Sequence, residues 1–528
     1  MGNGECSSAT PEPAPVSKAA GAALTPRSHS PLPLPFPIPH SSLPIRKLLS
    51  FAIFFLIARL ITTTWFVYLA VIPSGSMVPT LLGVHRDLTC PDCGATFPIG
   101  DEPRARWGQP ANTGQPVACA NCGYGFTLPE SSVAVGGEQV LVLPCAYAFR
   151  PPRRWEVVAF RQPLHARTLA VKRVVGLPGE EIELREGDVW ANGRRVQKGL
   201  EAQLATALLV HDAGHESGKA TDAPSRWRPE RDESSWRREG EQFVFRADAT
   251  REASSPQGGQ ERDPAKLDWL EYYHQRRLAG PKAMIEPTPI NDAYAYNQTQ
   301  PVLDVHKVDD VLLTCEVRHD GVGTFGIRAH TGNEAVTFTF GLSTRFTQFG
   351  ESFRNGQANY FTVVKFAPDI WHRLSVSLVD GRWLVALDDQ EWASPLLKFK
   401  PTEVPPTQPF ALGAHGGTVE VRRLQISRDI FYSLPAELTA GPGVEASAGL
   451  HAPYQLGPQD YYVLGDNSPR SLDSRYRRFG PGVDASLLTG RPLAVVWSPR
   501  SVSLGGWQFQ VPTFSRIRYI RSYDSSSP

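Results

Sequence analysis

The sequence lacks an excess of charge of either sign. Its 528 residues include 54 Lys and Arg against 53 Asp and Glu, a formal net charge of +1. Nothing in the overall charge therefore indicates a nucleic-acid partner. Charged residues make up 20% of the chain and apolar residues 41%, which is unlike a disordered protein. Because the chain is too long for one ordinary core, we expect two or three domains.

The first 44 residues lack the apolar periodicity that a core requires. They are rich in Pro, Ala and Ser, and we interpret them as a disordered cytoplasmic tail. A largely apolar run over residues 45–71 follows and is long enough to cross a bilayer, which takes roughly 20 helical residues. Arg46 and Lys47 at the start of this segment predict a single-pass anchor in the cytoplasmic membrane, with the N-terminus inside and the remainder of the chain outside.

Arg59 interrupts this apolar run. A charge in the middle of a bilayer is costly unless the side chain reaches an interface, so the span can also end near Arg59, with residues 60–72 along the membrane surface. A cleavable secretory signal is the alternative interpretation. The run is longer than the usual apolar core of such a signal, which favours a retained anchor.

Two segments together suggest a serine nucleophile with a lysine base. The first is IPSGSMVPTL at residues 72–81, which taken alone is typical of a tight turn. The second is AVKRVVG at residues 170–176, a strand-forming run that contains Lys172. An exposed strand lysine is the ordinary reading, but burial would lower the pKa of Lys172 and favour the neutral amine that a general base needs.

A third segment, GDNSPRSLDSR at residues 465–475, is rich in short polar side chains. As a structural feature it is an Asx-rich loop. As part of a site it could supply a hydroxyl that orients the lysine and a carboxylate that holds an arginine, the third group that an activated nucleophile usually has.

The three segments resemble the boxes of bacterial type I signal peptidases, which are serine proteases with a Ser/Lys dyad. They occur in the family's order behind an N-terminal apolar run. Residues 137–142 and 156–160 are similar to the family's strand-forming boxes, although the positions usually held by Asp carry Glu or Gln here. The boxes span about 72–83, 137–198 and 459–498, a minority of the chain.

The resemblance implies a role for each matching residue. Ser76 would be the nucleophile and Lys172 the general base, with no cofactor for catalysis. Ser74 would form an oxyanion hole with the backbone N–H of Ser76, and Ser471 would hydrogen-bond Lys172. An ion-pair network bracing the loop would consist of Arg173, Asp466, Asp473 and Arg475.

The resemblance also implies the substrate and the partners. Signal peptides of secretory preproteins would bind as an extended strand and be cut after small residues in an Ala-x-Ala-like pattern. The apolar residues Ile72, Met77 and Val171 would line the pockets. The membrane lipid bilayer would be the second partner, because the apolar segment of the substrate is itself held there.

Cysteines are few, and four of the seven form two Cys-x-x-Cys-Gly pairs within residues 89–130: Cys90, Cys93, Cys119 and Cys122. Two such pairs match a tetrahedral structural zinc site of the zinc-ribbon type. Two disulfides are the alternative, since a location outside the membrane permits them. No open coordination position is suggested, so we expect no metal catalysis.

About 250 residues separate the lysine segment from the Gly-Asp-Asn segment, which predicts a domain-sized insertion. Residues 200–284 are charged and are interpreted as a linker and the start of the insertion. Residues 285–428 contain short alternating strands, a hairpin signal at Asp380-Gly381, and three tryptophans, Trp371, Trp383 and Trp392. They resemble a laminin-G or concanavalin-type β-sandwich, which would bind carbohydrate or protein.

The predicted fold is therefore mainly β, with little helix outside the anchor. The catalytic core would combine residues 72–88, 131–199 and 429–528, with the zinc ribbon and the β-sandwich inserted into it. The alternative function is that of a membrane-tethered binding or sensor protein in which the sandwich is the working part.

Overall fold

The computed structural model describes most of the chain between residues 43 and 520. The described ranges are 43–61, 66–101, 114–215, 218, 223–247, 267–278, 284–298, 305–331, 334–342, 348–354, 357–364, 366–392, 405–433, 448–450, 452–477, 479–504 and 507–520. Most of the predicted cytoplasmic tail, residues 1–42, lies outside them. The chain divides into two compact units, Met1–Arg59 and Leu60–Pro528.

The predicted anchor, residues 45–71, is helical only in its first part. Helix α1 runs over Leu43–Ile61 and carries Arg59 in its last turn. Within the described residues, no helix is both long enough and apolar enough to cross a membrane. The predicted end of the anchor at residue 71 is wrong, because Tyr68–Val71 form strand β1 and pair with strand β6, Gln139–Leu143. In β1, Tyr68 and Ala70 pack on apolar residues of the sheet, so burial in the protein accounts for their apolar character.

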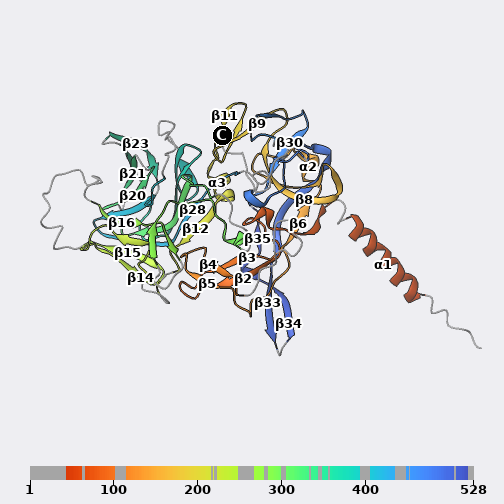
Figure 1. The fold of residues 1–528 in the computed structure, drawn as a ribbon, viewed down its shortest axis with the longest axis horizontal. Coiled ribbons are helices and arrows are strands. Elements are labelled where there is room, and N and C mark those ends of the chain that lie inside the picture. The colour runs from red at the N-terminus through yellow and green to blue at the C-terminus, as the bar shows by residue number, and fades with distance from the viewer. Residues whose placement is uncertain are drawn as a thin grey trace, which may run out of the picture. The chain divides into compact units, whose positions relative to one another are not determined.

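One antiparallel sheet gathers strands from distant parts of the second unit (Figure 1). Its hydrogen-bonded order is β1, β6, β32 (Leu488–Trp497), β7 (Val157–Gln162), β8 (His165–Gly176), β30 (Asp460–Leu464) and β31 (Val483–Asp484), with β35 (Arg518–Tyr519) beside β32. We call it the catalytic sheet. The predicted core segments 131–199 and 429–528 thus interleave in one sheet, although a domain-sized insertion separates them in sequence.

Small elements surround this sheet. Helices other than α1 are short in the described residues: α2 (Ala146–Phe149), α3 (Leu200–Thr206), and the 3₁₀ turns η2 (Gly75–Met77), η4 (Ala295–Asn297), η5 (Ser468–Arg470), η6 (Ala485–Leu487) and η7 (Phe514–Arg516). A small sheet has the order β11 (Arg194–Arg195), β10 (Asp188–Ala191), β9 (Glu181–Arg185) and β29 (Tyr454–Gln455). Four hairpins are β2 (His85–Thr89) with β3 (Thr96–Gly100), β4 (Pro116–Ala118) with β5 (Gly125–Thr127), β17 (Gln275–Leu278) with β18 (Met284–Pro287), and β33 (Pro499–Leu504) with β34 (Trp507–Pro512).

The insertion folds as two antiparallel sheets that share one apolar core. The eight-stranded sheet has the order β14 (Trp236–Glu239), β15 (Gln242–Arg246), β28 (Thr418–Arg428), β19 (Val311–His319), β24 (His372–Val379), β25 (Arg382–Leu387) and β26 (Gln390–Trp392), with β12 (Leu208–Asp212) beside β28. The seven-stranded sheet has the order β13 (Trp227–Pro229), β16 (Asp268–Tyr272), β27 (Phe410–His415), β20 (Thr324–His330), β21 (Ala335–Gly341), β22 (Gln348–Arg354) and β23 (Gln357–Val364). We call these two sheets the sandwich.

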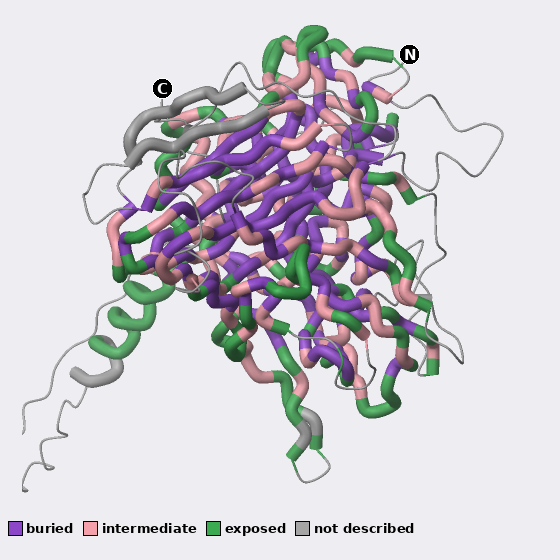
Figure 2. Tube along the Cα trace, turned by 90° about the vertical axis from the view of Figure 1, so that its left-hand side faces the viewer, coloured by how far each residue is buried: buried purple, intermediate pink, exposed green. Residues whose placement is uncertain are grey.

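Buried residues follow the strands of the second unit (Figure 2). The predicted hairpin at Asp380-Gly381 is confirmed, because both residues have positive φ, +53° and +71°, and join β24 to β25. Such a two-residue turn matches the twist of the strands on either side. The laminin-G or concanavalin class of the sandwich stays a prediction.

The described part of residues 200–284, interpreted from the sequence as a charged linker and the start of the insertion, belongs to the insertion rather than to a linker. Strands β12 to β16 belong to the two sheets of the sandwich, and Trp227, Trp236 and Phe243 are buried in its core. In β14 the buried Trp236 is followed by less buried charged residues. Alternation places aromatic side chains inward and charged ones outward, and a count of charge alone does not detect this. Residues 248–266 lie outside the described residues.

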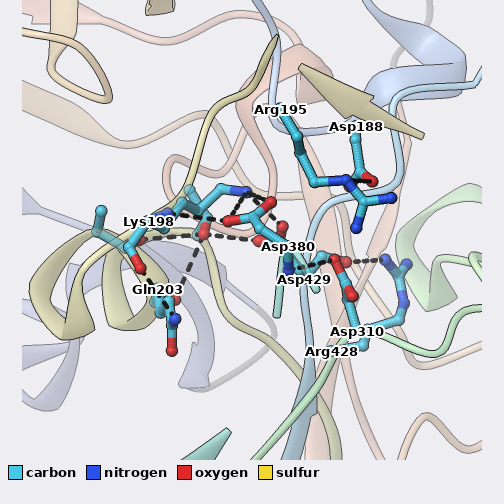
Figure 3. Close-up of polar contacts among 10 residues, drawn as sticks. Asp188, Arg195, Lys198, Gln203, Asp310, Asp380, Arg428 and Asp429 are labelled. Carbon is cyan, nitrogen blue, oxygen red and sulfur yellow. Dashed lines mark hydrogen bonds and ion pairs between the residues drawn. The ribbon is translucent and has the colours of Figure 1, made fainter. Parts of the chain in front are cut away.

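A buried polar cluster joins the sandwich to the catalytic core (Figure 3). The Lys198 ammonium lies 3.0 Å from a carboxylate oxygen of Asp380 and 2.7 Å from one of Asp429. Thr206, at the end of α3, donates to the other oxygen of Asp429 at 2.8 Å. Because Lys198 is buried and faces two carboxylates, these contacts offset the cost of removing its charge from water. We call this cluster the junction.

Candidate active site

The serine and lysine predicted to react lie in contact. Ser76 is in turn η2, a few residues after the edge strand β1, and Lys172 is in β8. The Lys172 Nζ donates a hydrogen bond of 2.7 Å to Ser76 Oγ. Lys172 is 4% exposed, whereas Ser76 is only half-buried. The strand therefore holds an amine largely removed from water against a hydroxyl that solvent can reach.

Ser74 lies beside the same hydroxyl. Its Oγ donates to Ser76 Oγ at 3.4 Å, a long hydrogen bond. Gly83 packs against this turn so closely that a Cβ on it would come within 2.3 Å of the Ser74 carbonyl carbon. Only a glycine fits at Gly83, and the absence of a side chain there lets the turn settle against the following segment.

The Gly-Asp-Asn loop holds the backbone of the nucleophile turn. The backbone N–H of Asn467 donates to Ser76 O at 3.1 Å, and the Asn467 side-chain amide donates to Gly75 O at 2.9 Å. A Cβ on Gly465 would lie 2.5 Å from Ser76 O. The close approach of the two backbones therefore explains why glycine is needed at residue 465.

Two buried ion pairs brace this loop, each formed by an arginine with an aspartate. Arg173 contacts Asp466 through two hydrogen bonds of 2.8 and 2.6 Å, and Arg475 contacts Asp473 through two of 2.8 and 2.7 Å. All four side chains are fully buried. The structure thus brings the four predicted support residues together as two pairs.

The surroundings of each pair favour its charged form. Burial would lower the pKa of Arg173 and raise that of Asp473, but the partner charges outweigh burial in both cases. The pKa of Arg173 is raised, chiefly by the charge of Asp466, and the pKa of Asp473 is lowered, chiefly by the charge of Arg475. Both guanidinium groups also donate to backbone carbonyls, including Trp155 O at 2.7 Å.

The predicted hydrogen bond between Ser471 and Lys172 stays a prediction. Ser471 is buried, and its hydroxyl bonds to the Asp473 carboxylate, where it helps the charge of Arg475 to lower the pKa of Asp473 against the effect of burial. The hydroxyl lies against the backbone of Gly465, where an added Cβ would be 2.2 Å away. Ser471 therefore packs tightly against its own loop.

The predicted substrate-binding residues lie in one apolar cluster. Ile72 and Met77 are buried members of it, and Val171 is half-buried and packs against it. Their neighbours include Leu81 and Val140. The three residues are therefore close together, as the resemblance implies, although two of them are largely covered by protein.

Sequence reasoning missed several residues that support the nucleophile segment. Thr80 donates to the Asp466 carboxylate. The buried Glu138 accepts the backbone N–H of Leu82 at 3.0 Å and pairs with Arg518 at 2.9 Å. Glu138 lies in residues 137–142, which resemble one of the family's boxes, so the sequence could have indicated that it supports the site. Arg518 carries no local motif, and only the fold brings it to Glu138.

The four paired cysteines lie at the tips of hairpins β2–β3 and β4–β5. Their sulfur atoms are all within 4.8 Å of one another, with separations of 3.7 Å for Cys90 and Cys122 and 3.6 Å for Cys93 and Cys119. Zinc–sulfur bonds of about 2.3 Å in a tetrahedron place sulfur atoms about 3.8 Å apart, whereas a disulfide requires about 2.05 Å. The cluster can therefore hold a metal ion, and its spacing fits zinc.

Comparison with known proteins shows partial similarity to signal peptidases. Residues 130–248 match the family model described as signal peptidase, peptidase S26. Signal peptidase I V of Bacillus subtilis (strain 168) is 35% identical over 60 residues, 11% of this chain and 34% of that protein. Probable signal peptidase I-2 of Synechocystis is 30% identical over 66 residues, 12% of this chain and 30% of that protein. The chain thus spans about a third of the length of these relatives.

Solved structures resemble this chain only weakly. A carbohydrate-binding module from Bacillus subtilis is 10% identical with a TM-score of 0.22, over 38% of this chain and 95% of that one. A galectin of Caenorhabditis elegans is 12% identical with a TM-score of 0.18, over 23% and 84% of the two chains. Scores this low carry no conclusion about the sandwich. The family match and the curated relatives show that part of this chain is similar to signal peptidases of family S26.

Proposed function

We propose that the chain is a signal peptidase I, a membrane-bound serine endopeptidase that removes signal peptides from exported preproteins. The observation that carries the proposal is the 2.7 Å hydrogen bond between Lys172 Nζ and Ser76 Oγ. Burial of the lysine adds to it, because an amine removed from water is more easily held in the neutral form that a base requires.

The reaction follows from this pair. Neutral Lys172 takes the proton of Ser76 as Oγ attacks the carbonyl carbon of the scissile bond. The lysine then gives the proton to the departing amine, which leaves an acyl-enzyme on Ser76. Water attacks the ester with Lys172 again as the base, Lys172 passes this proton to the departing Ser76 Oγ, and the carboxylate product is released.

Negative charge that develops on the carbonyl oxygen needs hydrogen-bond donors. The backbone N–H of Ser76 and the hydroxyl of Ser74 are the proposed donors, since both lie in the turn that carries the nucleophile. The Ser74 hydroxyl would have to rotate away from Ser76 Oγ to reach the oxyanion. Donors fixed in advance by the fold are an effective way to stabilise such charge.

The substrate is proposed to bind beside β1, which is a terminal strand of the catalytic sheet. In the part of the chain that the structure describes, no strand pairs with the other edge of β1, and an extended peptide can pair there. Ile72, Met77 and Val171 would shape small pockets for Ala-like side chains, so cleavage would follow Ala-x-Ala-like sequences.

Membrane attachment is proposed through α1 and, in the second unit, the hairpin β33–β34. Leu48, Phe54 and Phe55 of α1 are more than half exposed, as are Leu504 and Trp507 of the hairpin. Apolar side chains this exposed suit a lipid surface. The catalytic core would then lie on the outer side of the cytoplasmic membrane. Failure of the full chain to float with liposomes would argue against attachment.

Cleavage of a synthetic preprotein in liposomes tests the proposed function. Wild type should cut after the Ala-x-Ala-like site, whereas Ser76→Ala and Lys172→Ala should each reduce kcat by at least about a thousandfold. Lys307→Ala, a lysine of the sandwich side, is the matched control and should cut like wild type. Equal rates for Ser76→Ala and wild type would refute the proposal.

A further inference from the structure

A short segment of the insertion reaches into the catalytic core. It comprises residues 294–298 around turn η4, and we call it the insertion arm. The Tyr296 hydroxyl donates to Val84 O at 2.7 Å. The Gln298 side chain pairs with the backbone of Ala118, between the cysteine pairs, through bonds of 2.6 and 2.7 Å. The insertion arm therefore touches the nucleophile segment and the cysteine hairpins at once.

Asn297 of the insertion arm contacts the residue that holds the nucleophile turn. Its side-chain amide donates to Asn467 Oδ1 at 2.8 Å and accepts from Asn467 Nδ2 at 2.9 Å. The same Asn467 binds Gly75 O through its side chain and Ser76 O through its backbone. Asn297 is thus two hydrogen bonds away from the backbone of Ser76.

Tyr294 fixes the neighbouring residue of the loop. Its hydroxyl donates to Asp466 O at 2.5 Å, and both residues are buried. Burial raises the pKa of Tyr294 to about 12, so the phenol keeps the proton that it donates. The carboxylate of Asp466 is held by Arg173, and the hydroxyl of Tyr294 fixes the backbone of the same residue from another side.

The base of the insertion arm is attached to the sandwich. Asp292 accepts from His306 N at 2.8 Å, and its backbone carbonyl accepts from Arg428 Nη2 at 2.9 Å. Arg428 also lies over the ring of Tyr294, 4.8 Å from its centre. Because Arg428 is in β28, the position of the insertion arm is set by a central strand of the sandwich.

We propose that Tyr294 and Asn297 are positioning residues for the peptidase reaction, which orient Ser76 by fixing Asp466 and Asn467. The insertion is then a working part of the active site. This inference rests on the proposed function only for its kinetic consequence. The positioning itself is a property of the fold and can be measured separately.

The kinetic test compares conservative deletions in the full-length protein. Asn297→Ala and Tyr294→Phe should each lower kcat for a synthetic preprotein roughly ten- to a hundredfold, because a small displacement of a nucleophile has effects of this size. KM should stay within about twofold of wild type, since the substrate edge at β1 is untouched. Tyr273→Phe removes a phenol elsewhere in the insertion, and Asn192→Ala removes an amide in the small sheet; both variants should leave both constants unchanged.

Hydrogen exchange followed by mass spectrometry gives the second readout. In Asn297→Ala and Tyr294→Phe, peptides covering residues 74–81 and 465–470 should exchange faster than in wild type, while the β19 and β28 peptides keep their protection. The two control variants should exchange like wild type throughout. Loss of protection across all peptides would identify a general folding defect and overturn the positioning role.

The outcomes separate the two proposals. A wild-type protein that cuts no preprotein would refute the proposed function, and the exchange of residues 465–470 would still test the insertion arm. Unchanged exchange and unchanged kcat in Asn297→Ala and Tyr294→Phe would overturn the positioning role while the peptidase assignment stands.

Discussion

At the scale of single residues, the chemistry of the site depends on groups that are costly to bury. Arg173, Asp466, Asp473 and Arg475 are fully buried, and each charge is compensated only by its partner and by nearby polar groups. Removing one member of such a pair leaves the other as an uncompensated charge inside the protein. The loop beside Ser76 should therefore be sensitive to changes that preserve shape but remove charge.

Asp473→Asn tests this sensitivity. The substitution keeps the size of the side chain but leaves the Arg475 guanidinium without its counter-charge, so we expect a loss of about 3–5 kcal/mol in the free energy of unfolding. Urea denaturation of the full chain measures it. Glu183→Gln removes one side of an exposed ion pair with Arg185 and should show no measurable change. Similar midpoints for the two variants would contradict the role of burial.

The sequence indicates the proposed Ser76–Lys172 pair more directly than the residues that support it. Ser76 and Lys172 stand in local patterns whose residue types have a chemical meaning, so they could be found from sequence alone. Asn297 and Tyr294 contact the loop from about 170 residues away, and nothing in their local sequence indicates this. The position of the Ser471 hydroxyl depends on packing against Gly465, which a motif does not encode.

At the scale of elements, two further carboxyl groups lie beside Asp380 of the junction. Oxygens of Asp188, Asp310 and Asp380 lie within 4.8 Å of one another. Desolvation raises the pKa of Asp188 to about 7 and raises those of Asp310 and Asp380. The pKa of Lys198 is also raised, because the charges of Asp380 and Asp429 outweigh its burial. The lysine therefore stays charged while the carboxyl groups titrate.

The junction should consequently lose stability as the pH rises. A carboxyl group whose pKa is raised in the folded state binds its proton more tightly there than in the unfolded chain, where the pKa is about 3.9. The stability that this tighter proton binding adds is fully present below the unfolded pKa. It is lost as the pH rises through the folded pKa, which is near 7 for Asp188. We expect a lower melting temperature at pH 8 than at pH 5.5.

Asp310→Asn provides the matching variant. It removes one of the titrating groups, so the difference in melting temperature between pH 5.5 and pH 8 should shrink. Asp369→Asn removes an exposed carboxylate on the sandwich and should leave that difference as in wild type. A larger difference in melting temperature between pH 5.5 and pH 8 in Asp310→Asn than in wild type would contradict a role of this carboxyl group in the pH dependence.

The elements themselves were partly predictable. Alternating apolar residues and the Asp380-Gly381 turn indicated the strands of residues 285–428. The strands of residues 200–284 were overlooked because their charged residues mask the buried aromatic ones, as in β14. The apolar run at 45–71 was ambiguous for a different reason, since burial in a sheet and burial in lipid require similar side chains.

At the scale of the whole molecule, the cysteine hairpins connect parts that are distant in sequence. The Asn121 side chain accepts from Asp212 N at 2.6 Å and donates to His215 O at 3.3 Å. Asp92 forms a buried ion pair of 2.8 Å with Arg277. Because the hairpins contact the insertion on several sides, the state of the four sulfur atoms should affect more than the hairpins.

We expect one zinc ion per chain, bound as a structural metal. Its removal by a strong chelator should lower the melting temperature of the full chain and leave four additional reactive thiols. Cys93→Ser should have the same effect without chelator, while Cys145→Ser, outside the cluster, should resemble wild type. Elemental analysis measures the metal. A protein without zinc and without these free thiols would instead contain the disulfides.

A consequence follows from the pairing of the first and last strands of the insertion. Leu208 at the start of β12 lies opposite Arg428 at the end of β28. The first and last strands of the sandwich thus pair with each other, so the sandwich can fold once the chain up to residue 428 has left the ribosome. The catalytic sheet still waits for β30 and β32, because β32 lies between β6 and β7. During synthesis the sandwich can therefore form before the sheet that carries Lys172 is complete, and the proposed Ser76–Lys172 site is assembled only after residue 497 has emerged.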